Sequence, residues 1–158
     1  MLRISRITDY ATVVMAYLAL HPTEIQNAKD INLHTHIALP TVSKILKLLA
    51  KANLVISHRG VNGGYSLAES PDKIFITQII EAIEGTMGLT ACAHLKGECQ
   101  IESYCAIRGN WRSISEMILN ALQEVRLTEL MNTPTQHEVS FKPFLTKSPR
   151  SQEGRRHE

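Results

Sequence analysis

The sequence predicts a mainly α-helical protein with one small β-hairpin and a long C-terminal helix. Three observations support this fold class. Apolar residues recur at helical spacing in the first 52 residues, and a glycine-rich turn at residues 59–64 separates two short strand-like runs. A second helical stripe covers residues 107–126. The 158 residues suffice for one domain, or for one small domain with an appendage.

Three helices are expected before the hairpin. Ser5 or Thr8 can cap the first of them, and Asn27 can cap a second helix over residues 28–35. The third opens at Pro40, a residue favoured in the first turn, and runs to about residue 52. Only a few residues separate the second and third helices, which is typical of a helix-turn-helix.

The third helix has two faces of different chemistry. Its apolar residues gather on one side, namely Val42, Ile45, Leu46, Leu49 and Ala52. Its basic residues gather on the opposite side, namely Lys44, Lys47 and Lys51. A lysine face alone usually means only a solvated surface, so its interpretation depends on the segment after residue 52.

That segment reads as a hairpin, with strands expected at residues 54–58 and 65–68. Its turn contains Arg59 and Gly60, and its glycines would permit close approach to phosphates. Three helices and a basic hairpin form a winged helix-turn-helix pattern, which favours DNA binding. Charge agrees, because residues 1–66 carry a net charge of +4 whereas residues 67–131 carry −4.

The second half predicts a short strand at residues 74–76, a helix capped by Thr77, and a helix of about 30 Å over residues 107–126. This last helix is longer than a winged-helix unit covers, so we expect a homodimer. The alternative is packing against the first helix. The expected organisation is a DNA-binding region, a cysteine loop with a dimerisation helix, and a disordered tail, at residues 1–70, 71–131 and 132–158.

All three cysteines lie within 14 residues, as Cys92, Cys99 and Cys105 with the spacing C-x6-C-x5-C. Three thiols cannot all pair in one chain, so metal or redox use is favoured over a disulfide framework, although three unremarkable thiols remain the alternative. Zinc sites prefer closer cysteine pairs, and the wider gaps favour a cluster. The fourth ligand stays open among four nearby or acidic side chains: Asp9, His94, Glu98 and Glu102. Of these, the two glutamates are expected to be solvated.

Other classes of protein fit less well. Arg3 and Arg6 precede an apolar stretch from residue 11 to residue 20, but Asp9 adjoins that stretch and no A-x-A pattern comes after it. The stretch is also too short to span a bilayer, so we expect a soluble, cytoplasmic protein without a membrane partner. No nucleophile, base and orienting group stand at recognisable spacing, so we do not expect an enzyme.

The chain resembles the winged-helix iron–sulfur cluster transcription regulators of the IscR, NsrR and RirA type. The motifs are LRISRITDYA, LPTVSKILKLL, RGVNGGYSLA, and IIEAIEG before the three cysteines. They span residues 1–130, and the sequence is most similar to regulators of the SUF cluster-assembly operon. The resemblance implies a homodimer that binds near-palindromic double-stranded DNA operators and changes its affinity with cluster state.

The resemblance also implies site residues. Cys92, Cys99 and Cys105 would hold the cluster. The histidine that IscR-type members place three residues after the last cysteine is Arg108 here, whereas the T-D pair matches the aspartate of NsrR-type members and implies Asp9 from the partner chain. A carboxylate ligand favours [4Fe–4S] over [2Fe–2S]. DNA contacts would come from the third helix and the wing, namely Pro40, Thr41, Ser43, Lys44, Lys47, Lys51, Arg59 and Gly60.

The expected function is therefore a cluster-sensing repressor of iron–sulfur cluster assembly genes. One alternative is a transcription regulator that uses zinc or thiol oxidation without a cluster. An alternative from another class is a small iron–sulfur electron-transfer protein. The lysine face and the basic hairpin disfavour that alternative.

Overall fold

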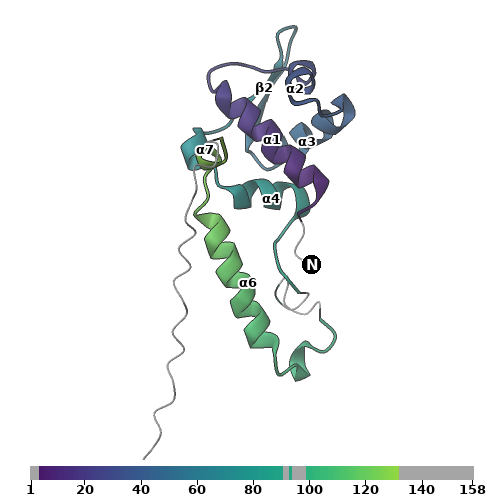
Figure 1. Ribbon diagram of the computed structural model, residues 1–158. Coiled ribbons are helices and arrows are strands. Elements are labelled where there is room, and N and C mark those ends of the chain that lie inside the picture. The colour runs from purple at the N-terminus through teal and green to yellow at the C-terminus, as the bar shows by residue number, and fades with distance from the viewer. Residues whose placement is uncertain (1–3, 91–92, 94–98, 132–158) are drawn as a thin grey trace, which may run out of the picture.

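The computed structural model describes residues 4–90, 93 and 99–131. It confirms the predicted fold class, with helices α1–α3 and a hairpin forming one lobe, from which α6 projects (Figure 1). The elements are α1 Arg6–Leu20, α2 Ala28–Thr35, α3 Leu39–Lys51, β1 Val55–His58, β2 Gly64–Leu67, η1 Pro71–Lys73, α4 Ile76–Glu84, η2 Glu102–Tyr104, α6 Arg108–Gln123 and α7 Leu127–Met131. The predicted tail at residues 132–158 lies outside the described residues.

Helices α1 to α3 form because each has a defined start and one apolar face. Ser5 caps α1, since its Oγ accepts a hydrogen bond from the Thr8 amide at 3.3 Å. Asn27 caps α2 in the same way through the Lys29 and Asp30 amides. The faces meet in one core, which contains Ala11, Val14, Met15, Leu18, Ile31, Val42, Ile45, Leu46 and Leu49.

The turn between α2 and α3 has a fixed shape. His36 ends α2 with a φ of 58°, a left-handed conformation that reverses the chain. The Asn32 side-chain amide then donates to the Ile37 carbonyl at 2.7 Å. Only residues 36–38 separate the two helices, so the predicted helix-turn-helix is present.

The hairpin is attached to the linker that precedes α2. Strands β1 and β2 pair antiparallel, with His58 opposite Gly64. The Gln26 amide donates to the Tyr65 carbonyl at 2.9 Å, and the Tyr65 amide donates to the Gln26 carbonyl at 2.8 Å. Because these two bonds extend the sheet by one bridge, the hairpin is held against the helical lobe at a defined angle.

The predicted strand at residues 74–76 is wrong. Phe75 makes a single bridge with Arg126, and α4 begins at Ile76, so no strand can propagate. The predicted Thr77 cap is also wrong, because Thr77 is buried inside α4. The Gln78 side chain instead accepts from the Phe75 amide at 2.8 Å and stabilises the helix start.

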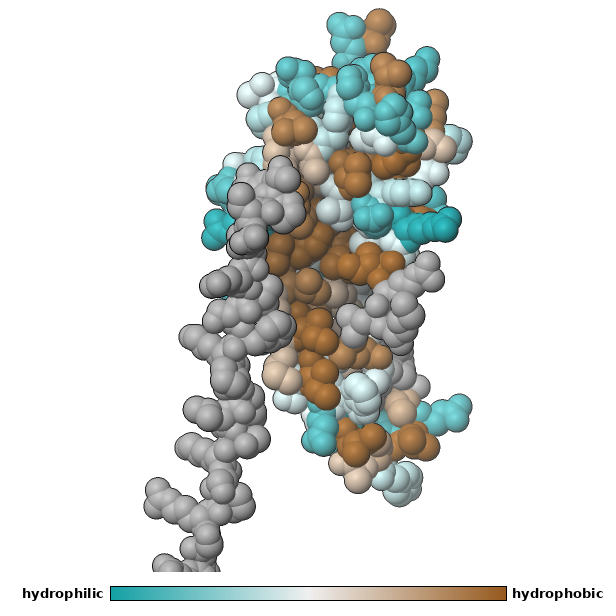
Figure 2. Space-filling view, in the orientation of Figure 1, coloured by the Kyte–Doolittle hydropathy of each residue, from teal (hydrophilic) through white to brown (hydrophobic). Residues whose placement is uncertain are grey.

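Helix α6 leaves apolar side chains uncovered. It is shorter than the predicted span, because α6 ends at Gln123 and residues 124–126 connect it to α7. Trp111, Ile114 and Met117 are 39%, 37% and 53% exposed, and Figure 2 shows hydrophobic surface running along this helix. Among the described residues, no helix has the length and apolarity that a bilayer crossing requires.

Candidate nucleic-acid interface and cysteine site

The lysine face of α3 points to solvent. Lys44, Lys47 and Lys51 are exposed. On the opposite side, Val42, Ile45, Leu46 and Leu49 are completely buried, so the core determines which side of α3 faces out. At the start of the helix, Pro40 is exposed whereas Thr41 and Ser43 are partly exposed. The structure thus places the predicted residues on one accessible, basic helix.

The wing brings two further predicted residues to the surface. Arg59 and Gly60 are exposed, and Gly60 has a φ of 117° with no atom within 4 Å of the place that a Cβ would occupy. Gly64 is required for a different reason, because a Cβ there would lie 2.6 Å from the Gln26 carbonyl oxygen. Gly60 therefore leaves the wing tip open, and Gly64 permits a tight contact with the protein's own backbone.

Two of the three cysteines can be placed. Cys99 and Cys105 are free thiols, both half-buried, and they flank the short turn η2. Cys92, His94 and Glu98 lie outside the described residues, as does Arg3. The part of the cysteine site that the structure describes is therefore a turn with one thiol on each side.

Glu102 holds this turn and is not the solvated residue that we expected. Its side chain is buried, and its Oε1 lies 2.8 Å from Arg112 Nη2 and 3.8 Å from Arg108 Nη1. Two cations thus compensate the buried carboxylate through its Oε1. Arg108, three residues after Cys105, thus has Glu102 as an acidic partner.

Asp9 is exposed in the first turn of α1. Within the described part of the chain, no three His, Cys, Asp or Glu side chains lie together as a metal site would require. Asp9 therefore does not join Cys99 and Cys105 within one chain.

Sequence reasoning missed a contact next to Asp9. Glu84, the last residue of α4, accepts hydrogen bonds from the Ser5 amide at 3.0 Å and from the Thr8 hydroxyl. These bonds, that of Thr8 first, lower the pKa of the Glu84 carboxyl. They join the start of α1 to the segment that leads into the cysteines. No local signal reveals a pair separated by 76 residues in the sequence.

Known proteins match nearly all of the described chain. The Rrf2 family model, described as an iron-dependent transcriptional regulator, matches residues 4–133. IscR of Aliivibrio salmonicida is 36% identical over 123 residues, which cover 77% of this chain and 73% of that protein. IscR of Erwinia tasmaniensis is 32% identical over 150 residues, which cover 94% and 90%.

Solved structures agree with these matches. CymR, the global cysteine regulator of B. subtilis, superposes with a TM-score of 0.65 at 26% identity, covering 83% of this chain and 97% of CymR. IscR of T. potens gives 0.63 at 25% identity, covering 82% and 86%. These relatives are transcriptional regulators rather than enzymes, in agreement with the prediction for this chain.

Proposed function

The chain belongs to the Rrf2 family of iron-dependent transcriptional regulators, and we propose that it senses an iron–sulfur cluster and controls DNA binding as a homodimer. One observation carries the sensing proposal. Cys99 and Cys105 are free, half-buried thiols on either side of a turn that Glu102 and Arg112 hold together. This arrangement supports binding of a soft metal centre, since thiolates favour clusters and zinc over hard cations.

The proposed ligands are Cys92, Cys99 and Cys105 with Asp9 of the partner subunit. The donor set fits an iron–sulfur cluster, because thiolates are the usual ligands of such clusters and Cys99 and Cys105 are free. A [4Fe–4S] cluster is favoured over [2Fe–2S]. When bound, it would supply a centre that reacts with oxidants or exchanges iron.

The proposed DNA interface consists of α3 and the wing. Pro40, Thr41, Ser43 and Lys44 would face base edges in the major groove, and Arg59 with Gly60 would approach the minor groove. Lys47 and Lys51 would bind phosphates, which set affinity and salt dependence rather than sequence preference. The exposure of Lys47 and Lys51 to solvent supports their role as phosphate contacts.

The proposed dimer contact is the uncovered face of α6. Ser115 and Leu122 lie on the side of α6 that faces the chain's own core, whereas Trp111 and Ile114 remain exposed. A second copy packed along α6 would bury these exposed apolar side chains.

Linkage between cluster and DNA would run through α1. The Glu84 contact ties the start of α1 to the entry of the cysteine segment, and α1 shares its core with α3. A cluster held by both subunits would therefore bias the relative position of the two α3 helices. We propose repression of cluster-assembly genes of the SUF type as the output.

Anaerobic native mass spectrometry after reconstitution tests the proposal. The expected species is a dimer with one [4Fe–4S] cluster per subunit, and Cys105→Ala should abolish cluster retention. A dimer that carries zinc, or no metal, would support the zinc or thiol-redox alternative instead. A cluster-loaded protein without DNA affinity would support the electron-transfer alternative.

Mixed dimers test the partner ligand. One subunit carries Asp9→Ala and the other carries Cys105→Ala, so partner donation leaves one site with every ligand intact. We expect one cluster of wild-type lifetime in each mixed dimer, and accelerated loss in the Asp9→Ala homodimer. If Asp9 acts within its own chain, both sites of the mixed dimer are damaged and no long-lived cluster remains.

A further inference from the structure

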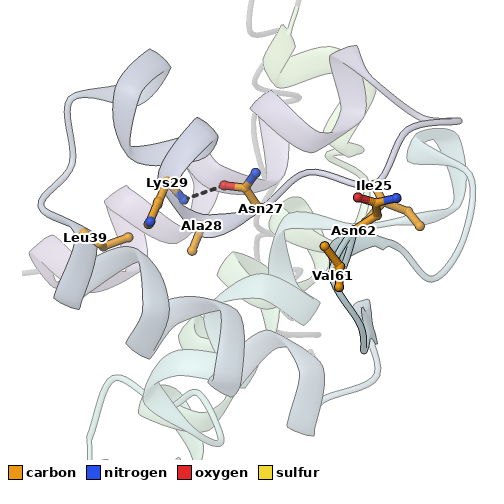
Figure 3. A pocket seen from close by; sticks show the side chains of 8 residues that line it. Ile25, Asn27, Ala28, Lys29, Leu39, Val61 and Asn62 are labelled. Carbon is orange, nitrogen blue, oxygen red and sulfur yellow. Dashed lines mark hydrogen bonds between the residues drawn. The ribbon is translucent and has the colours of Figure 1, made fainter.

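A cleft of about 580 Å³ separates the wing from the starts of α2 and α3. Lys29 lies on the α2 side, Leu39 lies at the start of α3, and Val61 with Asn62 forms the wing side, as Figure 3 shows. Ile25 also contributes to the lining. The cleft thus lies between the two elements that the proposed function assigns to DNA.

The cleft is built by the fold rather than left between loose elements. The two backbone bonds between Gln26 and Tyr65 fix the wing beside the α2 linker. The Asn27 side chain fixes the first turn of α2. The Tyr17 hydroxyl of α1 also contacts the buried Gln26 side chain at 3.2 Å. Both walls are therefore held in place before any ligand arrives.

The lining combines one cation with amide and apolar groups and contains no carboxylate. The exposed Lys29 side chain supplies the ammonium group, whereas the Lys29 backbone amide is already bonded to Asn27. Val61 is 105% exposed at the wing tip, and such a side chain gains by covering its methyl groups. A deoxyribose-phosphate chain matches this lining, since it alternates an anionic group with a largely apolar ring.

We propose that this cleft holds the single sugar-phosphate strand that separates the major groove read by α3 from the minor groove approached by the wing. Lys29 pairs with a phosphate of that strand, and Val61 packs against a neighbouring sugar. The proposal rests on the DNA-binding part of the proposed function and is independent of the cluster. A small-molecule effector fits less well, because effector pockets are enclosed and mostly apolar, whereas this cleft is open.

A methylphosphonate scan of an operator duplex tests this proposal. Each probe carries one uncharged linkage, and binding is measured for full-length wild type, Lys29→Ala, Lys47→Ala and Lys73→Ala. Lys73 is the matched control, because it is an exposed lysine on η1 beside α7. One or two linkages on the groove-separating strand should weaken the wild type and should have no further effect on Lys29→Ala, whereas Lys47→Ala should remain sensitive to them.

Salt dependence supplies the second readout. Lys29→Ala should make the log–log salt slope shallower by about one unit and weaken operator and random DNA by the same factor. Lys73→Ala should leave both unchanged. A wild-type slope and an unchanged linkage profile for Lys29→Ala would overturn the cleft proposal while Lys47→Ala still reports DNA binding. If the wild type itself binds no duplex, the proposed function fails instead.

Discussion

Gly64 shows how the absence of one side chain positions the wing. A Cβ at this residue would lie 2.6 Å from the Gln26 carbonyl oxygen, which is backbone and cannot rotate away. Gly64→Ala should therefore break the Gln26–Tyr65 bridge and destabilise the fold by about 1–3 kcal/mol. Thermal unfolding measures this, with Gly109→Ala as control because nothing lies within 4 Å of its Cβ position. Equal unfolding temperatures for the two variants would contradict the argument.

The carboxyl group of Glu84 makes the stability of the folded chain depend on pH. Its pKa is lower in the folded chain, chiefly because Thr8 donates a hydrogen bond to it. The stabilisation is therefore present above the ordinary carboxyl pKa and is lost as the pH falls through the lower, folded-state pKa. Glu84→Gln and Thr8→Val should unfold at lower temperature than wild type near neutral pH, and this gap should close as the pH falls below the ordinary carboxyl pKa.

Unfolding temperatures measured across this pH range check the Glu84 contact. The difference in unfolding temperature between each variant and the wild type should be small, since Glu84 is exposed and solvent screens its interactions. A gap that stays constant with pH would mean that the two variants act through packing and not through the ionised carboxylate.

At the scale of elements, α6 is the clearest case for a missing partner. Ile114→Glu would place a charge in the uncovered apolar face of the helix, where it opposes burial by a second copy. We expect this variant to sediment as a monomer, whereas Asn120→Glu, at an exposed polar position of the same helix, should remain dimeric. If both variants remain dimeric, the dimer contact lies on another surface.

Element types followed from the sequence where local periodicity was strong. The faces of α3 were predictable because Val42, Ile45 and Leu46 alternate with lysines at helical spacing, and they are buried as expected. The segment at residues 74–76, which forms no strand, was predicted wrongly because an apolar triplet is equally consistent with a strand and with a helix start. Its geometry is decided by pairing with Arg126, about 50 residues later.

The candidate site likewise contains some residues that local patterns predict and some contacts that only the fold creates. Cysteine spacing and the basic hairpin are local patterns, so Cys99, Cys105 and Arg59 could be selected from the sequence. The burial of Glu102 depends on a helix later in the chain, and the Glu84 contact joins residues far apart in the sequence. Contacts of this kind arise from packing, which single-sequence periodicity does not encode.

For the whole molecule, the proposal is one of linkage. The elements proposed to bind DNA occupy one lobe, the cysteine turn lies beside α6 away from that lobe, and α1 with α4 connects them (Figure 1). If cluster binding and DNA binding are coupled through these elements, each must alter the affinity for the other by the same factor.

DNA affinity of the cluster-loaded and the cluster-free dimer, measured anaerobically on the same duplex at the same salt, tests this linkage most directly. A duplex selected from random pools by both forms removes bias toward either one. We expect the two dissociation constants to differ by about 5- to 150-fold. Two forms that bind the duplex with equal affinity would show that the cluster does not control DNA binding.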